Sequence, residues 1–385
     1  MHQVNFSIRH ADLSEPILIT QPKDLKELAK SLAQEPIIAV DTESNSLYAY
    51  RERVCLIQFS TPYADYLVDP LALKNLSPLA SIFANPHIEK VFHAAEYDLI
   101  CMKRDFGFSF ANLFDTMITM RILGKKEIGL GTILENEFSV TQDKRLQRAN
   151  WGQRPLPPQL LAYARLDSHY LIPLRHRLLT ELKANDLWAL ALEDFNRLCH
   201  GNEHNHNNHE NEVCWRINGS SELTPRQATI LQEVCLYRNQ VARAVDRPLF
   251  KVFNNKLLLS IAAASPTSLD DLKKLPEINQ SQVRRHGKAI MQAVQRGLQA
   301  PIASPPRSPR PNEQYMARLE ALRQWRKKTA RQMGVESDIV LPRDLLYAIT
   351  ERNPRREEAL AKVMHDVPWR LEHFGKQILE VIRKC

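Results

Sequence analysis

The sequence predicts an α/β domain over residues 1–200, with a mixed sheet flanked by helices, followed by two all-α helical domains. Three strand-like segments separated by short gaps, 37–43, 54–60 and 64–69, come first. Short gaps between strands are typical of an antiparallel meander. Helical and strand-like segments then alternate, which is typical of a mixed α/β sheet.

The remaining elements of the first domain follow from local patterns. Helices are expected over 24–33, 75–85 and 94–106, and a short strand over 88–93. Residues 157–186 form a long helical stretch that opens with proline, a residue favoured at the first turn of a helix.

Two polar segments divide the chain. The first linker covers residues 201–221. It overlaps a His/Asn-rich run, 200–212, whose four histidines could bind a metal. A solvated linker is the favoured interpretation, because no apolar residue is present there to fix a geometry. The second linker, 300–312, is rich in proline and expected to be extended.

An internal repeat occupies the C-terminal part. The segments 222–299 and 313–385 repeat each other: a shift of 88 positions aligns their landmarks without a gap, so that Tyr237 falls on Trp325 and Pro266 on Pro354. Each copy has helical periodicity. Self-similarity at a fixed shift indicates two copies of one small helical domain.

Charge is divided unevenly along the chain of 385 residues. The net charge is +8, but residues 222–385 carry 29 Lys/Arg against 17 Asp/Glu, and residues 1–221 carry 23 against 27. A basic C-terminal half favours a polyanionic partner, although a solvated surface is an equally common cause. The first repeat has a net charge of +6 and the second +4, which predicts that the first contributes more to binding.

Bulk features favour a cytoplasmic protein. No apolar run approaches the roughly 18 residues of a membrane span, and no secretory signal is visible at the N-terminus. The six cysteines show no C-x-x-C spacing, as expected for reduced, buried thiols.

Acidic residues follow the first long strand. Asp41 and Glu43 are two positions apart, so their side chains point to the same face. Asp98 lies in a helical segment after a strand, and Tyr163 and Asp167 share one helix face. Each motif alone is common. Together, four carboxylates from three segments predict two divalent cations with oxygen ligands, Mg²⁺ or Mn²⁺. Two ions roughly 4 Å apart can activate water and stabilise the leaving oxygen of a phosphodiester.

The order of these motifs resembles the DEDD superfamily of 3′→5′ exonucleases, in the subclass with a tyrosine in the third motif. More narrowly, the chain resembles the ribonuclease D family. The three motifs are VDTESNSLYAYRERVCLIQFS, KVFHAAEYDL and LAYARLDSHYLIPL, and DKRLQRANWGQRPLPPQLLAYA leads into the third. The helical repeats resemble the HRDC domain. The resemblance implies a ribonuclease-H-like fold for the first domain.

Residue roles follow from this resemblance. It implies that Asp41, Glu43, Asp98 and Asp167 are metal ligands and that Tyr163 orients the attacking water. The sequence departs modestly from the family pattern at Asn150 and Ser168, outside the five motif positions.

Other polar residues near the motifs have two interpretations each. Four residues between the second and third motifs could hold phosphates or stack a base: Lys144, Arg148, Trp151 and Arg154. Alternatively, they are ordinary surface and packing residues. Asp115 is expected to cap the following helix.

The predicted function is that of a metal-dependent 3′→5′ exoribonuclease that releases 5′-monophosphates. The expected partner is RNA, by its single-stranded 3′ ends, with precursors of tRNA or other structured RNA as substrates implied by the resemblance. A monomer is favoured. A 3′→5′ DNA exonuclease is one alternative, and a non-catalytic nucleic-acid-binding scaffold is another. A helicase is disfavoured because no G-x-x-x-x-G-K-[ST] motif is present.

Overall fold

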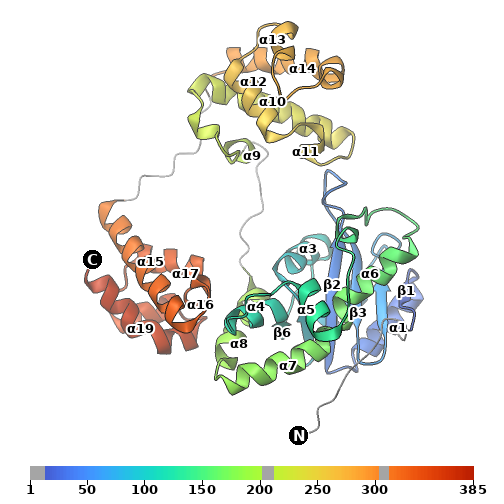
Figure 1. The fold of residues 1–385 in the computed structure, drawn as a ribbon, viewed down its shortest axis with the longest axis vertical. Coiled ribbons are helices and arrows are strands. Elements are labelled where there is room, and N and C mark those ends of the chain that lie inside the picture. The colour runs from blue at the N-terminus through green and yellow to red at the C-terminus, as the bar shows by residue number, and fades with distance from the viewer. Residues whose placement is uncertain (1–13, 202–211, 303–311) are drawn as a thin grey trace. The chain divides into compact units, whose positions relative to one another are not determined.

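The computed structural model describes residues 14–201, 212–302 and 312–385. Most of the histidine-rich run and of the proline-rich linker lies outside these residues. The described chain forms two compact units (Figure 1). One contains residues 14–44, 54–201 and 312–385, and the other contains 45–53 and 212–302. Among the described residues, no helix has both the length and the apolar character to cross a membrane.

The N-terminal domain is built on a mixed six-stranded sheet in the order β1-β4-β3-β2-β5-β6. β2, β3 and β4 form an antiparallel meander, whereas β1 pairs with β4, β2 with β5 and β5 with β6 in parallel. The predicted mixed sheet and its meander are therefore confirmed. The strands are β1 Ile17–Ile19, β2 Ile37–Ser44, β3 Val54–Ser60, β4 Asp65–Val68, β5 Glu89–Phe92 and β6 Leu113–Asp115.

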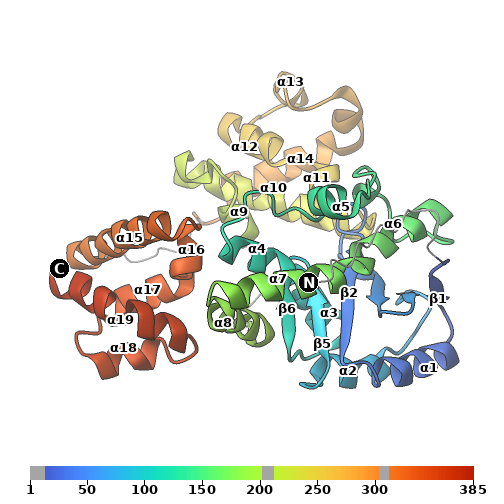
Figure 2. The same cartoon turned by 60° about the horizontal axis from the view of Figure 1, so that its bottom comes forward.

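Helices flank this sheet. α6 packs on β2, β3 and β4, and α8 packs on β6 beside α7 (Figure 2). The helices are α1 Pro22–Leu32, η2 Ser77–Leu79, α2 Ala80–Ala84, α3 Glu96–Phe106, α4 Thr116–Ile122, α5 Leu130–Phe138, η3 Leu146–Arg148, α6 Pro158–His169, α7 Leu171–Ala184 and α8 Trp188–His200.

The long helical stretch predicted over 157–186 is two helices. α6 ends at His169 and α7 begins at Leu171, on either side of Tyr170. Pro173 explains the break, because it has no backbone N–H to donate and its ring clashes with the carbonyl of the residue four positions before it, His169. Two short edge strands, β1 and β6, were not predicted; each has three residues, too few for a clear alternation of apolar and polar side chains.

The helical repeats agree with the shift of 88 at the level of single elements. Two short helical elements, α9 Glu212–Trp215 and η4 Ser220–Glu222, lie in or at the end of the predicted linker, which is therefore not entirely irregular. The first repeat contains α10 Pro225–Ala244, α11 Leu249–Val252, α12 Asn255–Ala264, α13 Leu269–Lys273 and α14 Gln280–Gln299. The second contains α15 Glu313–Met333, α16 Ser337–Val340, α17 Arg343–Arg352, α18 Glu357–Val363 and α19 Pro368–Arg383. α15 to α19 each start 88 residues after α10 to α14.

The second repeat packs on α8 within the same unit. The Arg370 side chain is fully buried and lies 3.0 Å from Glu193 and 2.9 Å from Asp194. Its guanidinium also donates to the carbonyl of Ile339 at 2.8 Å. A buried charge is costly unless it is paired and hydrogen-bonded, so these partners stabilise the contact with α8.

Candidate active site

The first two acids are held by the central strand β2. Ile38, Ala39 and Val40 are fully buried, which fixes the strand in the core. β2 pairs with β5 only over its first residues, 37–39, and pairs with β3 further along. Asp41 and Glu43 therefore stand at the end of β2 that extends past β5, and a β-bulge follows between Glu43 and Ser44.

The third acid comes from α6. Because α6 packs on β2, β3 and β4, the face that carries Tyr163 and Asp167 is turned to the sheet, where both residues are buried. Ligand oxygens of Asp41, Glu43 and Asp167 all lie within 4.8 Å of one another. This spacing suits a shared cation, and the donor set consists of carboxylates only, as Mg²⁺ and Mn²⁺ prefer.

Asp98 adjoins this trio from the first turn of α3. Its Oδ1 accepts a hydrogen bond from the Thr42 hydroxyl, the residue between Asp41 and Glu43. Its negative charge is also among the causes that raise the pKa of both Asp41 and Glu43. The structure thus brings three of the four predicted carboxylates within 4.8 Å of one another, and places Asp98 outside that trio but next to it, bonded to Thr42.

Burial and mutual repulsion disfavour the ionised carboxylates. The pKa of Asp41 is raised by burial first and then by Asp98, Asp167 and Glu43. Burial is likewise the main cause that raises the pKa of Glu43, and it raises the pKa of Asp98 and of Asp167 to about 7. Bound cations would reverse this effect, because an opposite charge nearby favours the ionised form.

Tyr163 stays protonated at any physiological pH. Burial, together with the charges of Asp167, Glu43 and Asp41, raises its pKa well above the usual value. Its ring lies 6.1 Å from the ring of Trp151. A phenol that keeps its proton can donate a hydrogen bond to an oxygen but cannot act as a base at neutral pH.

Two neighbours of the acids were missed from the sequence. Gln142 donates a hydrogen bond of 2.7 Å from Nε2 to Oδ1 of Asp167, and Thr42 donates to Asp98. Thr42 could have been noticed as the middle residue of the first motif. Gln142 precedes α6 in an irregular segment, and no local pattern of the sequence points to it.

The four predicted substrate contacts lie in different surroundings. Lys144 and Arg148 are exposed. Arg154 forms an ion pair with Asp69 at 2.6 Å and donates to the carbonyl of Cys55. Trp151 is only 1% exposed and packs in a core cluster, so the base-stacking interpretation is wrong for this residue, because stacking requires an accessible ring face.

Asp115 caps α4, as predicted. Its carboxylate accepts a hydrogen bond from Ile118 N at 2.9 Å and another from Ala95 N at 2.7 Å, so it ties the start of α4 to the start of α3. His93 forms a hydrogen bond of 2.9 Å with the Thr116 hydroxyl. This contact indicates a structural role for the histidine.

The fold and the acidic site are those of a 3′-5′ exonuclease domain followed by two helical repeats, and comparison with known protein families agrees. Residues 16–183 match the model of a 3′-5′ exonuclease, and residues 227–294 and 316–382 each match the HRDC domain. Ribonuclease D from Desulfotalea psychrophila is 30% identical over 284 residues, covering 73% of this chain and 75% of that protein. The chain belongs to the ribonuclease D family.

Other relatives extend this similarity. The exosome complex exonuclease RRP6 of Saccharomyces cerevisiae is 31% identical over 301 residues, which cover 74% of this chain and 41% of that protein. The crystal structure of Escherichia coli RNase D, described as an exoribonuclease involved in structured RNA processing, has a TM-score of 0.70 and 25% identity, and covers 96% of this chain and 99% of that one. The chain spans about a third to a half of the RRP6-like relatives it matches.

Proposed function

We propose that the protein is a metal-dependent 3′→5′ exoribonuclease. The observation that carries the proposal is the meeting of Asp41, Glu43 and Asp167 oxygens within 4.8 Å, on the domain that matches a 3′-5′ exonuclease. Family membership adds RNA as the substrate class, because ribonuclease D relatives act on RNA by their names. By the same analogy, we propose that the substrates are the 3′ ends of structured RNA, including tRNA precursors. We also propose that the protein acts in the cytoplasm.

In this proposal Asp41, Glu43, Asp98 and Asp167 hold two divalent cations. Bound Mg²⁺ or Mn²⁺ would supply an activated water and charge stabilisation for the leaving oxygen. We assign the first cation to Asp41, Glu43 and Asp167, whose ligand oxygens lie within 4.8 Å of one another, and the second to Asp41 with Asp98. The residue-level roles rest on the geometry and on the motif order.

Tyr163 orients the attacking water in this mechanism. Its hydroxyl lies on the α6 face that carries Asp167, and it remains a donor because its pKa is raised. Gln142 and Thr42 hold the carboxylates of Asp167 and Asp98 in place through their hydrogen bonds. Such outer partners commonly fix the orientation of metal ligands.

We further propose that the chain is divided into an exonuclease domain over 1–200, HRDC-like domains over 222–299 and 313–385, and linkers between them.

The function is tested by incubating the full chain with RNA and DNA oligomers of the same sequence, with and without Mg²⁺. Release of 5′-mononucleotides from RNA supports the proposal. A DNA exonuclease would degrade DNA in preference, and a binding scaffold would degrade neither.

A further inference from the structure

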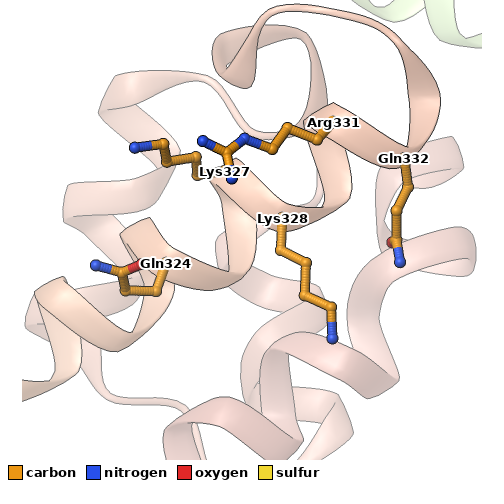
Figure 3. Close-up of a pocket in the computed structure, with 5 residues that line it drawn as sticks. All are labelled: Gln324, Lys327, Lys328, Arg331 and Gln332. Atoms are coloured by element: carbon orange, nitrogen blue, oxygen red, sulfur yellow. The ribbon is translucent and has the colours of Figure 1, made fainter.

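Gln58 on β3 is a buried polar side chain whose amide has no partner. Polar side chains at the surface, such as those of Lys327 and Lys328 on α15 (Figure 3), are exposed and can bond to water. Gln58 is fully buried, and within residues 14–201, 212–302 and 312–385 neither its Nε2 nor its Oε1 forms a hydrogen bond. A buried donor or acceptor without a partner costs free energy, and folded proteins contain few of them. The position therefore indicates a bonding role for the amide in the functional state of the protein.

The pairing of β2 with β3 places Gln58 directly opposite Asp41. Opposite residues of an antiparallel pair point to the same face of the sheet, and their Cβ atoms are about 5 Å apart. Ser60, two positions further along β3, is hydrogen-bonded to Ser168 of α6 at 2.8 Å, so this is the face that α6 covers. Gln58 therefore lies beside Asp41, beneath the helix that carries Asp167.

Side-chain donors hold two of the four carboxylates of the site: Thr42 donates to Asp98, and Gln142 donates to Asp167. The Asp41 carboxylate accepts from the backbone N–H of Thr42, and no side-chain donor to it is found among the described residues. The proposed mechanism nevertheless asks most of Asp41, because both cations share it. Gln58 can supply the missing donor, since the Nε2 of a glutamine carries two N–H groups.

We propose that Gln58 is the positioning residue of Asp41 in the metal-bound protein, an inference that rests on the proposed function. Its Nε2 donates to a carboxylate oxygen of Asp41 and fixes the orientation in which this aspartate holds both cations. Partners of this kind orient metal ligands, and their loss typically lowers metal affinity roughly 10- to 100-fold. In the metal-free protein the same amide stays unpaired, so its stabilising effect is confined to the metal-bound state.

The first test removes the amide from the full chain and measures Mn²⁺ binding without RNA. Gln58→Met and Gln58→Leu are both made, so that poor packing of one side chain does not decide the result. Leu56→Met is the control, because Leu56 is buried on the same face of β3, opposite Glu43, and has no polar atom to lose. The electron paramagnetic resonance signal of free Mn²⁺ reports the affinity. Both Gln58 variants are expected to bind Mn²⁺ about tenfold more weakly, and the control is expected to stay close to the unmodified chain.

Unfolding in excess chelator separates positioning from support of the fold. Because the variants remove an unpartnered buried amide, the free energy of unfolding without metal should stay level or rise. A glutamine that only supports the fold would show the reverse: lower stability without metal, and a loss of Mn²⁺ affinity no larger than that of Leu56→Met. That pattern would overturn the proposal, and so would Mn²⁺ affinities of both Gln58 variants equal to that of the unmodified chain.

The second test asks whether Gln58 acts through Asp41. Mn²⁺ affinity of the chain with both Gln58→Met and Asp41→Asn is compared with that of Asp41→Asn alone. The two should be nearly equal if the amide acts on the Asp41 carboxylate, whereas independent effects add. A further loss as large as that in the unmodified background would overturn the proposal. An unmodified chain that binds no Mn²⁺ would overturn the proposed function together with this inference, whereas unchanged binding by the Gln58 variants overturns this inference alone.

Discussion

Gln142 donates a hydrogen bond of 2.7 Å to Asp167, one of the three carboxylates that meet at the end of β2. The Gln142 amide lies on the irregular segment before α6, and Asp167 lies on α6 itself. The bond therefore links the orientation of a proposed metal ligand to a loop outside the three motifs.

Gln142→Leu should raise the Mg²⁺ concentration that gives half-maximal activity by about tenfold, because partners of metal ligands typically affect affinity by that order. The rate at saturating Mg²⁺ should recover in large part. The measurement is a Mg²⁺ titration of RNA cleavage. A half-maximal concentration equal to that of the unmodified chain would show that Gln142 has no positioning role.

Asp41→Asn should abolish cleavage and leave the fold intact. The site loses its shared ligand, while repulsion among the remaining carboxylates decreases in the metal-free protein. The free energy of unfolding without metal should therefore stay level or rise. Cleavage assays and denaturant unfolding of the same preparation check both parts, and turnover near that of the unmodified chain would refute the proposed site.

Tyr163→Phe should lower the cleavage rate by tenfold or more and change the Mg²⁺ requirement little. Removing the hydroxyl takes away a hydrogen-bond donor to water, whose loss is expected to affect the chemical step more than cation binding. Rates at saturating Mg²⁺ and a separate Mg²⁺ titration distinguish the two effects. Collapse of metal binding would mean that the tyrosine supports the ligands and does not orient water.

The metal-free protein should lose stability as pH rises from about 4 to about 7. The unfolded chain ionises Asp98 near its ordinary pKa of 3.8, whereas burial holds the folded pKa at about 7. Over this window the unfolded state releases its proton first, so ionisation favours unfolding, and the effect is complete above pH 7. The size is a few kcal/mol at most, since one pKa unit corresponds to about 1.4 kcal/mol.

Asp98→Asn isolates this effect. The stability of the variant minus that of the unmodified chain, both without metal, should increase between pH 4 and pH 7 and then level off. Asparagine keeps an oxygen that can accept from Thr42. Denaturant unfolding in the presence of a chelator measures the difference. A difference independent of pH would contradict the raised pKa of Asp98.

Periodic and repeated features of the fold could be predicted from the sequence. The two-residue alternation of a strand put Asp41 and Glu43 on one face, and the structure brings their oxygens together. The shift of 88 anticipated the helix starts of the second repeat, such as Arg343 for Asn255. Both predictions succeed because each depends on a pattern that the sequence itself displays, a two-residue alternation or an internal repeat.

Features that depend on tertiary packing could not be predicted. Trp151 looked available for stacking, yet it is buried beside Tyr163, because a sequence window does not reveal which face of an irregular segment meets the core. Gln142 reaches Asp167 only through the fold. The pairing of Arg370 with Glu193 joins residues that are distant in the sequence, and no local signal links them.

The most direct test of the central claim is digestion of a single-stranded RNA by the full chain, with the label at either end, in Mg²⁺ and in excess chelator. The Asp41→Asn chain is the control for contaminating nucleases. The account predicts that Mg²⁺-dependent cleavage releases 5′-mononucleotides one at a time from the 3′ end, and that neither chelator-treated protein nor the variant does so. Cleavage that persists in chelator, or products that begin at the 5′ end or inside the strand, would contradict it.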